Sequence, residues 1–217
     1  FEIIKAHPIH NISKEIYKRY INFTMIPERF YVDNLKLIWD FKDVQGCIVE
    51  CGVWRGGMSA GIATLLSDRE YFLFDSFEGL PKAKEIDGEG ALAWQSNTLS
   101  PGYHDNCKAE LEYASKAMTL SGAKHKLIKG WFNQTLPLAS FNEPIAILRL
   151  DADWYDSTMD CLTYLYPRVS KNGIIIFDDY YVWDGCSRAV HEYLSKTSSV
   201  SRIYRTQEGT PYLIKKD

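Results

Sequence analysis

Five short apolar runs, separated by segments of helical periodicity, restrict the fold of this 217-residue chain more than any other feature of its sequence. Each run has the length and the β-branched or aromatic content of a buried strand. The runs occupy residues 47–51, 71–75, 126–130, 145–150 and 173–177. Apolar residues recur at helical spacing in residues 58–66, 106–121, 157–166 and 184–195. This alternation predicts an α/β fold with a doubly wound, mostly parallel sheet that helices cover on both faces.

The two ends of the chain depart from this alternation. Residues 202–205 and 211–214 flank a glycine-containing turn, which predicts a C-terminal antiparallel hairpin. Residues 1–45 have helical character, and we expect them to form an N-terminal helical cap on a single domain that spans residues 1–217. The polar segment 81–105 is long for a compact domain, and we expect it to be a loop that acts as a lid.

Composition and charge exclude several classes of partner. The formal net charge is -3, so the chain lacks the basic surface of a nucleic-acid-binding protein. No apolar run approaches the ~20 residues of a membrane-spanning helix. The five cysteines form no CxxC pair, and residues 1–5 lack the blocks of a signal peptide. We therefore expect a cytoplasmic protein without nucleic-acid or membrane partners. Whether it forms a homo-oligomer, and whether it is part of a longer protein, the sequence leaves open.

A glycine-rich turn follows the first predicted strand. Gly52, Gly56 and Gly57 let the backbone turn tightly and approach a ligand above the N-terminus of the next helix. Their spacing differs from the GxGxxG of dinucleotide-binding proteins and favours a smaller nucleoside ligand. Asp75, at the end of the second strand, is placed to accept hydrogen bonds from ribose hydroxyls. The alternative is that Glu50 and Asp75 only cap neighbouring turns.

Aspartates follow the fourth and fifth predicted strands. Asp151 ends one strand, and Asp178 and Asp179 end the next. Because the carboxyl ends of adjacent parallel strands meet at one edge of a sheet, we expect these three side chains to lie close together. Crowded carboxylates repel unless a cation neutralises them, and oxygen ligands select hard ions such as Mg²⁺. The sequence therefore predicts a divalent-metal site, with caps and solvated turn residues as the alternative. Asp153 points the same way only if the strand continues past Asp151.

These motifs together resemble the macrocin O-methyltransferase family, the TylF-like enzymes of antibiotic biosynthesis. The resemblance covers most of the chain in the family's order. It rests on residues 24–25, 49–57, 75–81, 129–132, 136–137, 148–153 and 178–180. It implies a class I, Rossmann-like methyltransferase fold, S-adenosylmethionine (AdoMet) as methyl donor and Mg²⁺ as helper. The implied acceptor is a small-molecule hydroxyl, often on a sugar or another natural-product intermediate.

The resemblance also implies roles for individual residues. Glu50, Gly52 and Arg55 would line the methionine part of the cofactor. Asp75 would bind its ribose. Ser76 or Trp131 would flank the adenine. The implied cofactor-binding residues are Met25, Glu50, Gly52, Val53, Arg55, Ser59, Asp75, Ser76, Gly130, Trp131, Phe132 and Asp151.

The chemistry of methyl transfer fits the acidic residues. Transfer is an in-line displacement at a sulfonium carbon, so the acceptor oxygen must be close and aligned. A metal held by Asp151, Asp178 and Asp179 would lower the pKa of a weakly acidic hydroxyl. Asp153, or a ligand such as Asp151, would then take the proton as the catalytic base.

Two other classes of function stay open on the sequence alone. One is a nucleotide-binding oxidoreductase on a similar sheet, although the missing GxGxxG and the paired Asp178 and Asp179 count against it. The other is a non-catalytic ligand-binding module on the same fold. Residues 87–103 do not identify a particular acceptor.

Overall fold

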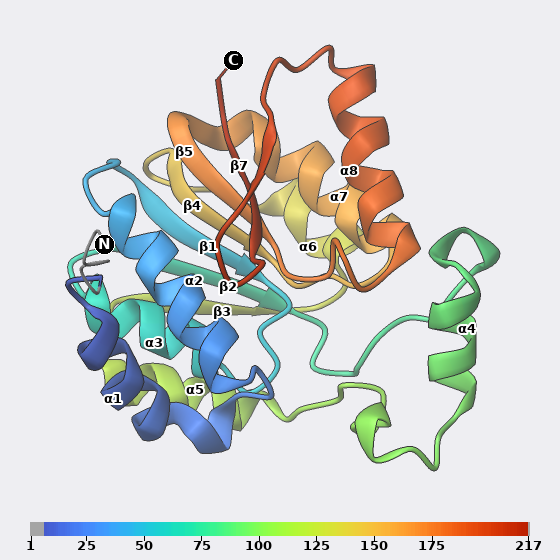
Figure 1. Ribbon diagram of the computed structural model, residues 1–217, viewed down its shortest axis with the longest axis horizontal. Helices are drawn as coiled ribbons and strands as arrows, with labels where there is room; N and C mark the ends of the chain where they lie inside the picture. The colour runs from blue at the N-terminus through green and yellow to red at the C-terminus, as the bar shows by residue number, and fades with distance from the viewer. Residues whose placement is uncertain (1–6, 217) are drawn as a thin grey trace, which may run out of the picture.

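A seven-stranded sheet forms the centre of the structure, a computed structural model that describes residues 7–216 (Figure 1). The strand order is β3-β2-β1-β4-β5-β7-β6. The first five strands in this order pair in parallel, whereas β7 is antiparallel to both β5 and β6. The strands are β1 (Cys47–Cys51), β2 (Tyr71–Asp75), β3 (His125–Lys129), β4 (Ile145–Leu150), β5 (Val169–Phe177), β6 (Ile203–Arg205) and β7 (Pro211–Ile214).

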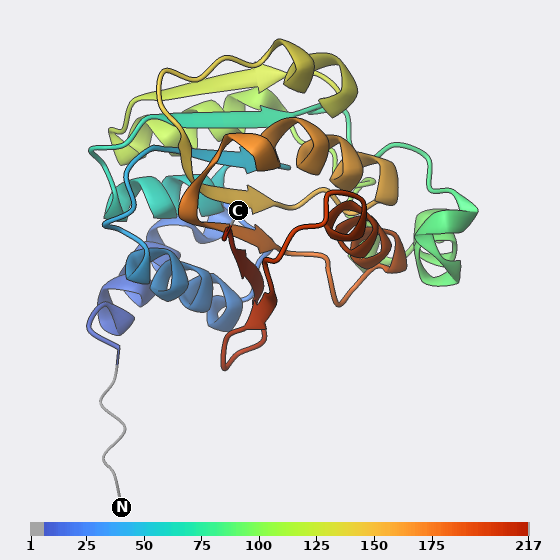
Figure 2. The ribbon, with the colours of Figure 1, turned by 90° about the horizontal axis from the view of Figure 1, so that it is seen from above.

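Helices cover both faces of the sheet (Figure 2). One face packs against α1 (His10–Tyr20), η1 (Ile21–Phe23), α2 (Glu28–Asp40), α3 (Gly57–Leu65) and α5 (Leu111–Ser121). The other packs against α6 (Phe132–Thr135), η4 (Leu136–Leu138), α7 (Tyr155–Leu165), η5 (Tyr166–Arg168) and α8 (Asp184–Lys196). Within the described residues, no helix combines the length and apolar character needed to cross a membrane.

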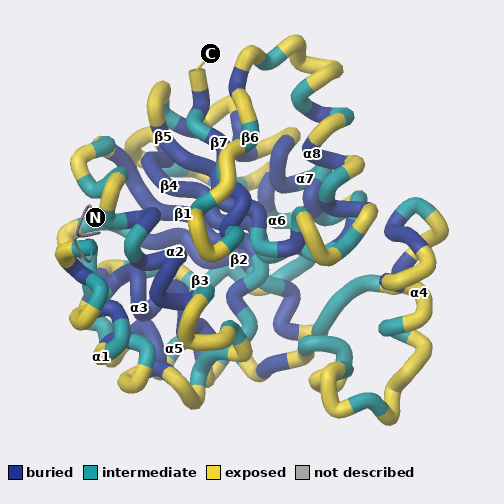
Figure 3. The backbone as a smooth tube through the Cα atoms, viewed as in Figure 1, coloured by how far each residue is buried: buried dark blue, intermediate teal, exposed yellow. Residues whose placement is uncertain are grey.

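The core divides into two layers because successive strand residues point to opposite faces. In β2, Tyr71 and Leu73 pack against one helical layer, while Phe72 and Phe74 pack against the other. Strands buried on both faces need continuous apolar runs, which is what the sequence has. Figure 3 shows these strands as the buried centre of the molecule, with exposed residues on the outer helices and loops.

The predicted architecture is confirmed. Three strands have the predicted bounds, and residues 203–205 and 211–214 form the predicted hairpin. The third strand ends at Lys129, so Gly130 lies just beyond it. The fifth begins at Val169, earlier than predicted.

Two predicted segments are wrong in detail. Residues 106–121 do not form one helix, because α5 begins only at Leu111. Residues 104–107 have φ angles between 47° and 58°, which a right-handed helix cannot contain. The segment 81–105 is not a plain loop, since it contains η2 (Glu85–Asp87), α4 (Glu89–Ser96) and η3 (Pro101–Tyr103). This inserted segment stands at the edge of the molecule, away from the sheet (Figure 1).

The described part of the predicted N-terminal cap contains α1, η1 and α2. Residues 1–6 of that cap, and the prediction about a signal peptide, lie outside the described residues.

Candidate functional site

The carboxyl ends of the central strands meet at one edge of the sheet, as predicted. Backbone hydrogen bonds continue from strand to strand just past the strand ends, so the residues that follow each strand are held side by side. These bonds run from Gly130 N to Asp75 O at 2.9 Å, from Asp151 N to Cys51 O at 2.8 Å, and from Asp178 N to Leu150 O at 2.9 Å.

A cavity of about 640 Å³ opens at this edge. Its wall includes most of the predicted cofactor residues: Met25, Gly52, Asp75, Ser76, Gly130, Trp131, Phe132 and Asp151. The predicted acids Asp153, Asp178 and Asp179 line the same cavity. The glycine-rich turn and the acidic cluster, which lie far apart in the sequence, therefore face one space.

Gly52 makes the close approach of the first and fourth strands possible. Its φ is +84°, and a Cβ atom at this position would lie 1.7 Å from the carbonyl oxygen of Asp151. Any side chain at position 52 would displace Asp151, so this glycine links the geometry of the turn to that of the acidic cluster.

Asp75 holds the glycine-rich turn in place. One carboxylate oxygen accepts hydrogen bonds from the backbone amides of Val53 at 2.6 Å and Trp54 at 2.8 Å, and the other accepts from Phe77 at 2.7 Å. Burial raises the pKa of Asp75, and these three amides oppose the shift. The capping role that the sequence left as an alternative is therefore present, in a residue that also lines the cavity.

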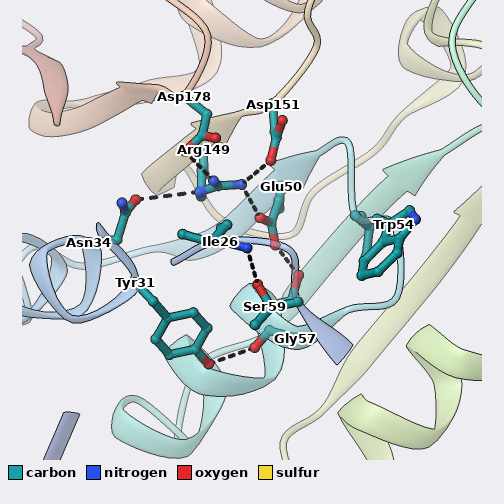
Figure 4. Close-up of polar contacts among 12 residues, drawn as sticks. Ile26, Tyr31, Asn34, Glu50, Trp54, Gly57, Ser59, Arg149, Asp151 and Asp178 are labelled. Atoms are coloured by element: carbon teal, nitrogen blue, oxygen red, sulfur yellow. Dashed lines mark hydrogen bonds and ion pairs between the residues drawn. The ribbon is translucent and has the colours of Figure 1, made fainter. Parts of the chain in front are cut away.

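A buried arginine, Arg149 on β4, lies behind the cavity and connects three carboxylates (Figure 4). Its Nη1 donates to Glu50 at 2.7 Å and to Asp151 at 2.9 Å, and its Nη2 donates to Asp178 at 2.5 Å. Burial opposes the charge, but Asp178, Asp151 and Glu50 outweigh it and hold the pKa of Arg149 well above its usual value. The motifs of the sequence did not predict this residue, although a charged side chain inside an apolar strand is a signal for it.

The acidic cluster differs in arrangement from the predicted set. Carboxylate oxygens of Asp151, Asp153 and Asp179 lie within 4.8 Å of one another. Asp178 instead turns its carboxylate to Arg149. Burial and mutual repulsion raise the pKa values of Asp151 and Asp179 well above the usual range. Three hard oxygen donors that face one cavity have the chemistry of a divalent-cation site, so these residues fit such an ion.

Asp153 has a strained backbone, with φ of 54°. Its amide donates to the Asp179 carboxylate at 2.9 Å, which fixes the turn between the two acids. Burial, assisted by the charges of Asp178 and Asp75, raises the pKa of Asp153 to about 7. A carboxylate with this pKa can exchange a proton near neutral pH.

Leu80 and Asn106, which flank the inserted segment, bond to each other. Leu80 N donates to Asn106 O at 3.0 Å, and Asn106 Nδ2 donates back to Leu80 O at 2.7 Å. Gln95 of α4 also donates to Asn106 Oδ1, at 3.0 Å. The left-handed conformation of Asn106 is thus part of this closure. The segment contributes Lys82, Lys84 and other residues to the cavity wall.

An aromatic cluster joins the inserted segment to the rest of the molecule. The ring of Trp94 on α4 lies 6.1 Å from that of Trp154 and 5.9 Å from that of Trp183, between centroids. Asp87 of the same segment is buried and accepts from the amide of Tyr155 at the start of α7. The segment is therefore docked on the α7 and α8 side of the cavity.

The sequence profile of the family described as Macrocin-O-methyltransferase (TylF) matches residues 20–207. This range includes every residue of the cavity described above except Gly209, Thr210 and Pro211. The chain belongs to the TylF family of macrocin O-methyltransferases. The resemblance inferred from the motifs is thus confirmed.

Two TylF-family relatives carry specific names. Demethyldecarbamoylnovobiocin O-methyltransferase of Streptomyces niveus is 37% identical over 164 residues, covering 71% of this chain and 60% of the relative. Mycinamicin III 3''-O-methyltransferase of Micromonospora griseorubida is 37% identical over 158 residues, covering 69% of this chain and 61% of the relative. The chain therefore spans about 60% of the length of these relatives.

The structure of the O-methyltransferase NovP is similar to this TylF-family chain. The TM-score is 0.73 and the sequences are 31% identical, over 90% of this chain and 83% of that one. The likeness confirms the class I methyltransferase fold.

Four predicted cofactor residues of this TylF-family chain lie outside the cavity wall. Glu50 and Ser59 bond to each other behind it, and the guanidinium of Arg55 stacks between the rings of Trp54 and Tyr113 at 4.5 and 4.7 Å. The fourth, Val53, is buried and contributes its amide to Asp75.

Proposed function

We propose that this chain is an AdoMet-dependent O-methyltransferase that uses a divalent cation, most simply Mg²⁺, to methylate a hydroxyl of a small molecule. The observation that carries the proposal is that the glycine-rich turn and the acidic cluster line the same cavity. A donor site and an activating site must be adjacent for in-line transfer. Family membership supports the same activity.

The cofactor would bind along the ends of the first three strands. Gly52 leaves room for the methionine part, and Asp75 faces the cavity with a carboxylate that can accept further hydrogen bonds. Ser76 and Trp131 line the same wall and would flank the adenine. The roles of Glu50 and Ser59 toward the cofactor would be indirect, since both lie behind the wall.

The cation would be held by aspartates at the ends of the fourth and fifth strands. Asp151 and Asp179 belong both to the predicted set and to the observed cluster. The proposed third ligand is Asp178, as in the predicted set, which leaves Asp153, the third member of the observed cluster, available as a base. Once bound, a hard divalent cation lowers the pKa of a coordinated hydroxyl.

Asp153 is the proposed general base. It lines the cavity, and its pKa of about 7 lets it accept a proton near neutral pH. The turn that carries it is fixed by its amide bond to Asp179. In this mechanism Asp153 removes the hydroxyl proton while the cavity wall holds the acceptor in line with the methyl group.

The acceptor is proposed to be a hydroxyl of a sugar or another natural-product intermediate. Two relatives with 37% identity are named for demethyldecarbamoylnovobiocin and mycinamicin III. The cavity combines an acidic floor with exposed apolar residues, Tyr181 and Val182, which suits an acceptor with a polar and an apolar part. The inserted segment would act as a lid over it. Free cysteines agree with a reducing cytoplasm as the location.

Calorimetric titration tests the proposal. AdoMet and its product S-adenosylhomocysteine should bind, NAD should not, and chelation followed by Mg²⁺ addition should leave cofactor binding intact. Binding of NAD in preference to AdoMet would support an oxidoreductase instead. Failure to bind any of the three would support the non-catalytic alternative.

A further inference from the structure

We propose that Arg149 is a positioning residue of the cation site, which it holds in shape together with Glu50. This inference rests on the proposed function, because it concerns the aspartates that would bind the cation. It assigns a task to two buried charged residues that do not line the cavity.

Arg149 reaches carboxylates from three neighbouring strands. Figure 4 shows its guanidinium between Asp151 and Asp178 on one side and Glu50 on the other. Only 1% of its side chain is exposed, whereas Asp151 and Asp178 are exposed by 31% and 29%. The arginine is therefore the buried support, and the two aspartates extend from it toward the cavity.

The planar guanidinium explains why an arginine occupies this position. Nη1 is shared by Glu50 and Asp151, while Nη2 binds Asp178, so the fork fixes the two aspartates relative to each other. A lysine would supply one ammonium group on a flexible stem and could not hold both in the same way.

Glu50 completes the support from the other side. Its side chain is 2% exposed, and Ser59 donates to the oxygen that Arg149 leaves free. Because both carboxylate oxygens are occupied and the residue lies outside the cavity wall, Glu50 acts on the site through Arg149. Replacing a group that hydrogen-bonds to a metal ligand typically lowers the metal affinity by roughly 10–100-fold.

The experiment is a Mn²⁺ titration of the chelator-treated, folded protein, followed by calorimetry and by loss of the free Mn²⁺ signal in electron paramagnetic resonance. Arg149→Lys should bind Mn²⁺ roughly 10–100-fold more weakly than wild type. Arg69→Lys is the matched control. Arg69 also donates to three acceptors, the carbonyls of Lys42, Val44 and Gly46, but it lies far from the cavity wall, so this variant should bind as wild type does.

Glu50→Gln provides a second test that keeps the arginine. It should weaken Mn²⁺ binding roughly 10-fold, because Arg149 loses its charged anchor. Glu70→Gln is its control, since the Glu70 side chain is also little exposed, at 9%, but pairs with Lys124 and Lys126. Thermal melting and far-UV circular dichroism verify that each variant is folded. If Arg149→Lys does not fold, Glu50→Gln decides the question.

The outcomes separate this inference from the proposed function. If folded Arg149→Lys binds Mn²⁺ with wild-type affinity, the positioning role is overturned while the cation site stands. If that variant does not fold, the same result for Glu50→Gln has the same meaning. Tighter binding in these variants would also overturn it, because Arg149 would then act only as a competing charge. If the wild-type protein binds no Mn²⁺, the cation-dependent function itself fails and the inference fails with it.

Discussion

The indole Nε1 of Trp183 donates a hydrogen bond of 3.0 Å to the carboxylate of Asp153. The same indole packs on Trp154, at 5.2 Å between ring centroids, and on Trp94 of the inserted segment. The proposed base is thus connected through one side chain to the segment that we expect to cover the acceptor. This contact stabilises the ionised form of Asp153 against the effect of its burial.

Trp183→Phe should therefore lower the free energy of unfolding by about 1–3 kcal/mol at pH 8, where Asp153 is ionised and would lose its donor. Trp94→Phe makes the same ring change but removes only an exposed bond to the Gly102 carbonyl, so it should cost less. Urea denaturation of both variants provides the measurement. Equal losses would show that ring volume, and not the hydrogen bond, matters.

Chelated protein should become less stable as the pH rises. The folded-state pKa of Asp153, about 7, exceeds its ordinary value of 3.8, so the folded protein holds this proton more tightly than the unfolded chain. Such a group contributes stability that is fully present below the unfolded pKa and is lost as the pH rises through the folded pKa. Melting temperatures at pH 5.5 and pH 8 test the direction, and Asp153→Asn should reduce the difference. A melting temperature that increases with pH in chelator would contradict it.

The variants Asp178→Asn and Asp153→Asn should distinguish the role of metal ligand from the role of general base. Asp178→Asn keeps the side-chain size but removes a charge, so metal affinity and turnover should fall while AdoMet binding is retained. Asp153→Asn should abolish turnover and retain the metal if Asp153 is the base. Turnover in wild type should stop in chelator and return with Mg²⁺. Full activity at verified negligible metal content would refute the cation mechanism.

Asp75→Ala should weaken S-adenosylhomocysteine binding by about 1–3 kcal/mol, because the ribose loses a charged acceptor. The melting temperature should fall as well, since three backbone amides of the turn lose their partner. Asp68→Ala, at an exposed position, is the control. An affinity equal to that of wild type would remove Asp75 from the ribose site.

Residues 81–105 should exchange amide hydrogens more slowly when cofactor and acceptor are both bound. Lys82 and Lys84 line the cavity and would bring this segment into contact with an acceptor bound there. Hydrogen-exchange mass spectrometry with each ligand alone and with both gives the comparison. Strong protection in the free protein would mean that the segment is a fixed wall.

The sequence predicted those parts of the fold that depend on local pattern. The strand 71–75 is apolar on both faces, and such a run has few alternatives to a buried strand. The helix prediction was wrong at residues 104–107, which form a left-handed turn. This turn includes the hydrogen bond from Asn106 to Leu80, a contact between residues that are distant in the sequence. Helical periodicity reports only the local pattern of apolar residues and gives no information on contacts between distant residues.

The site was predicted in its composition better than in its geometry. Strand-end aspartates could be placed at one edge from topology alone. The direction in which Asp178 points could not, because it depends on Arg149, whose neighbours come from three strands. Strand prediction from apolar runs gives no role to a buried charged residue such as Arg149.

The pairing of Leu80 with Asn106 has a consequence for how proteins of this kind diversify. The chain leaves the body of the molecule and returns to it at two points that are bonded to each other, so what lies between them can change in length and sequence without moving the strand ends. Gly52 and Asp75, the residues proposed to bind the methyl donor, both precede Leu80 and so lie outside this segment. On the proposed function, we expect exchange of this one contiguous stretch between family members to change the choice of acceptor more than the binding of the methyl donor.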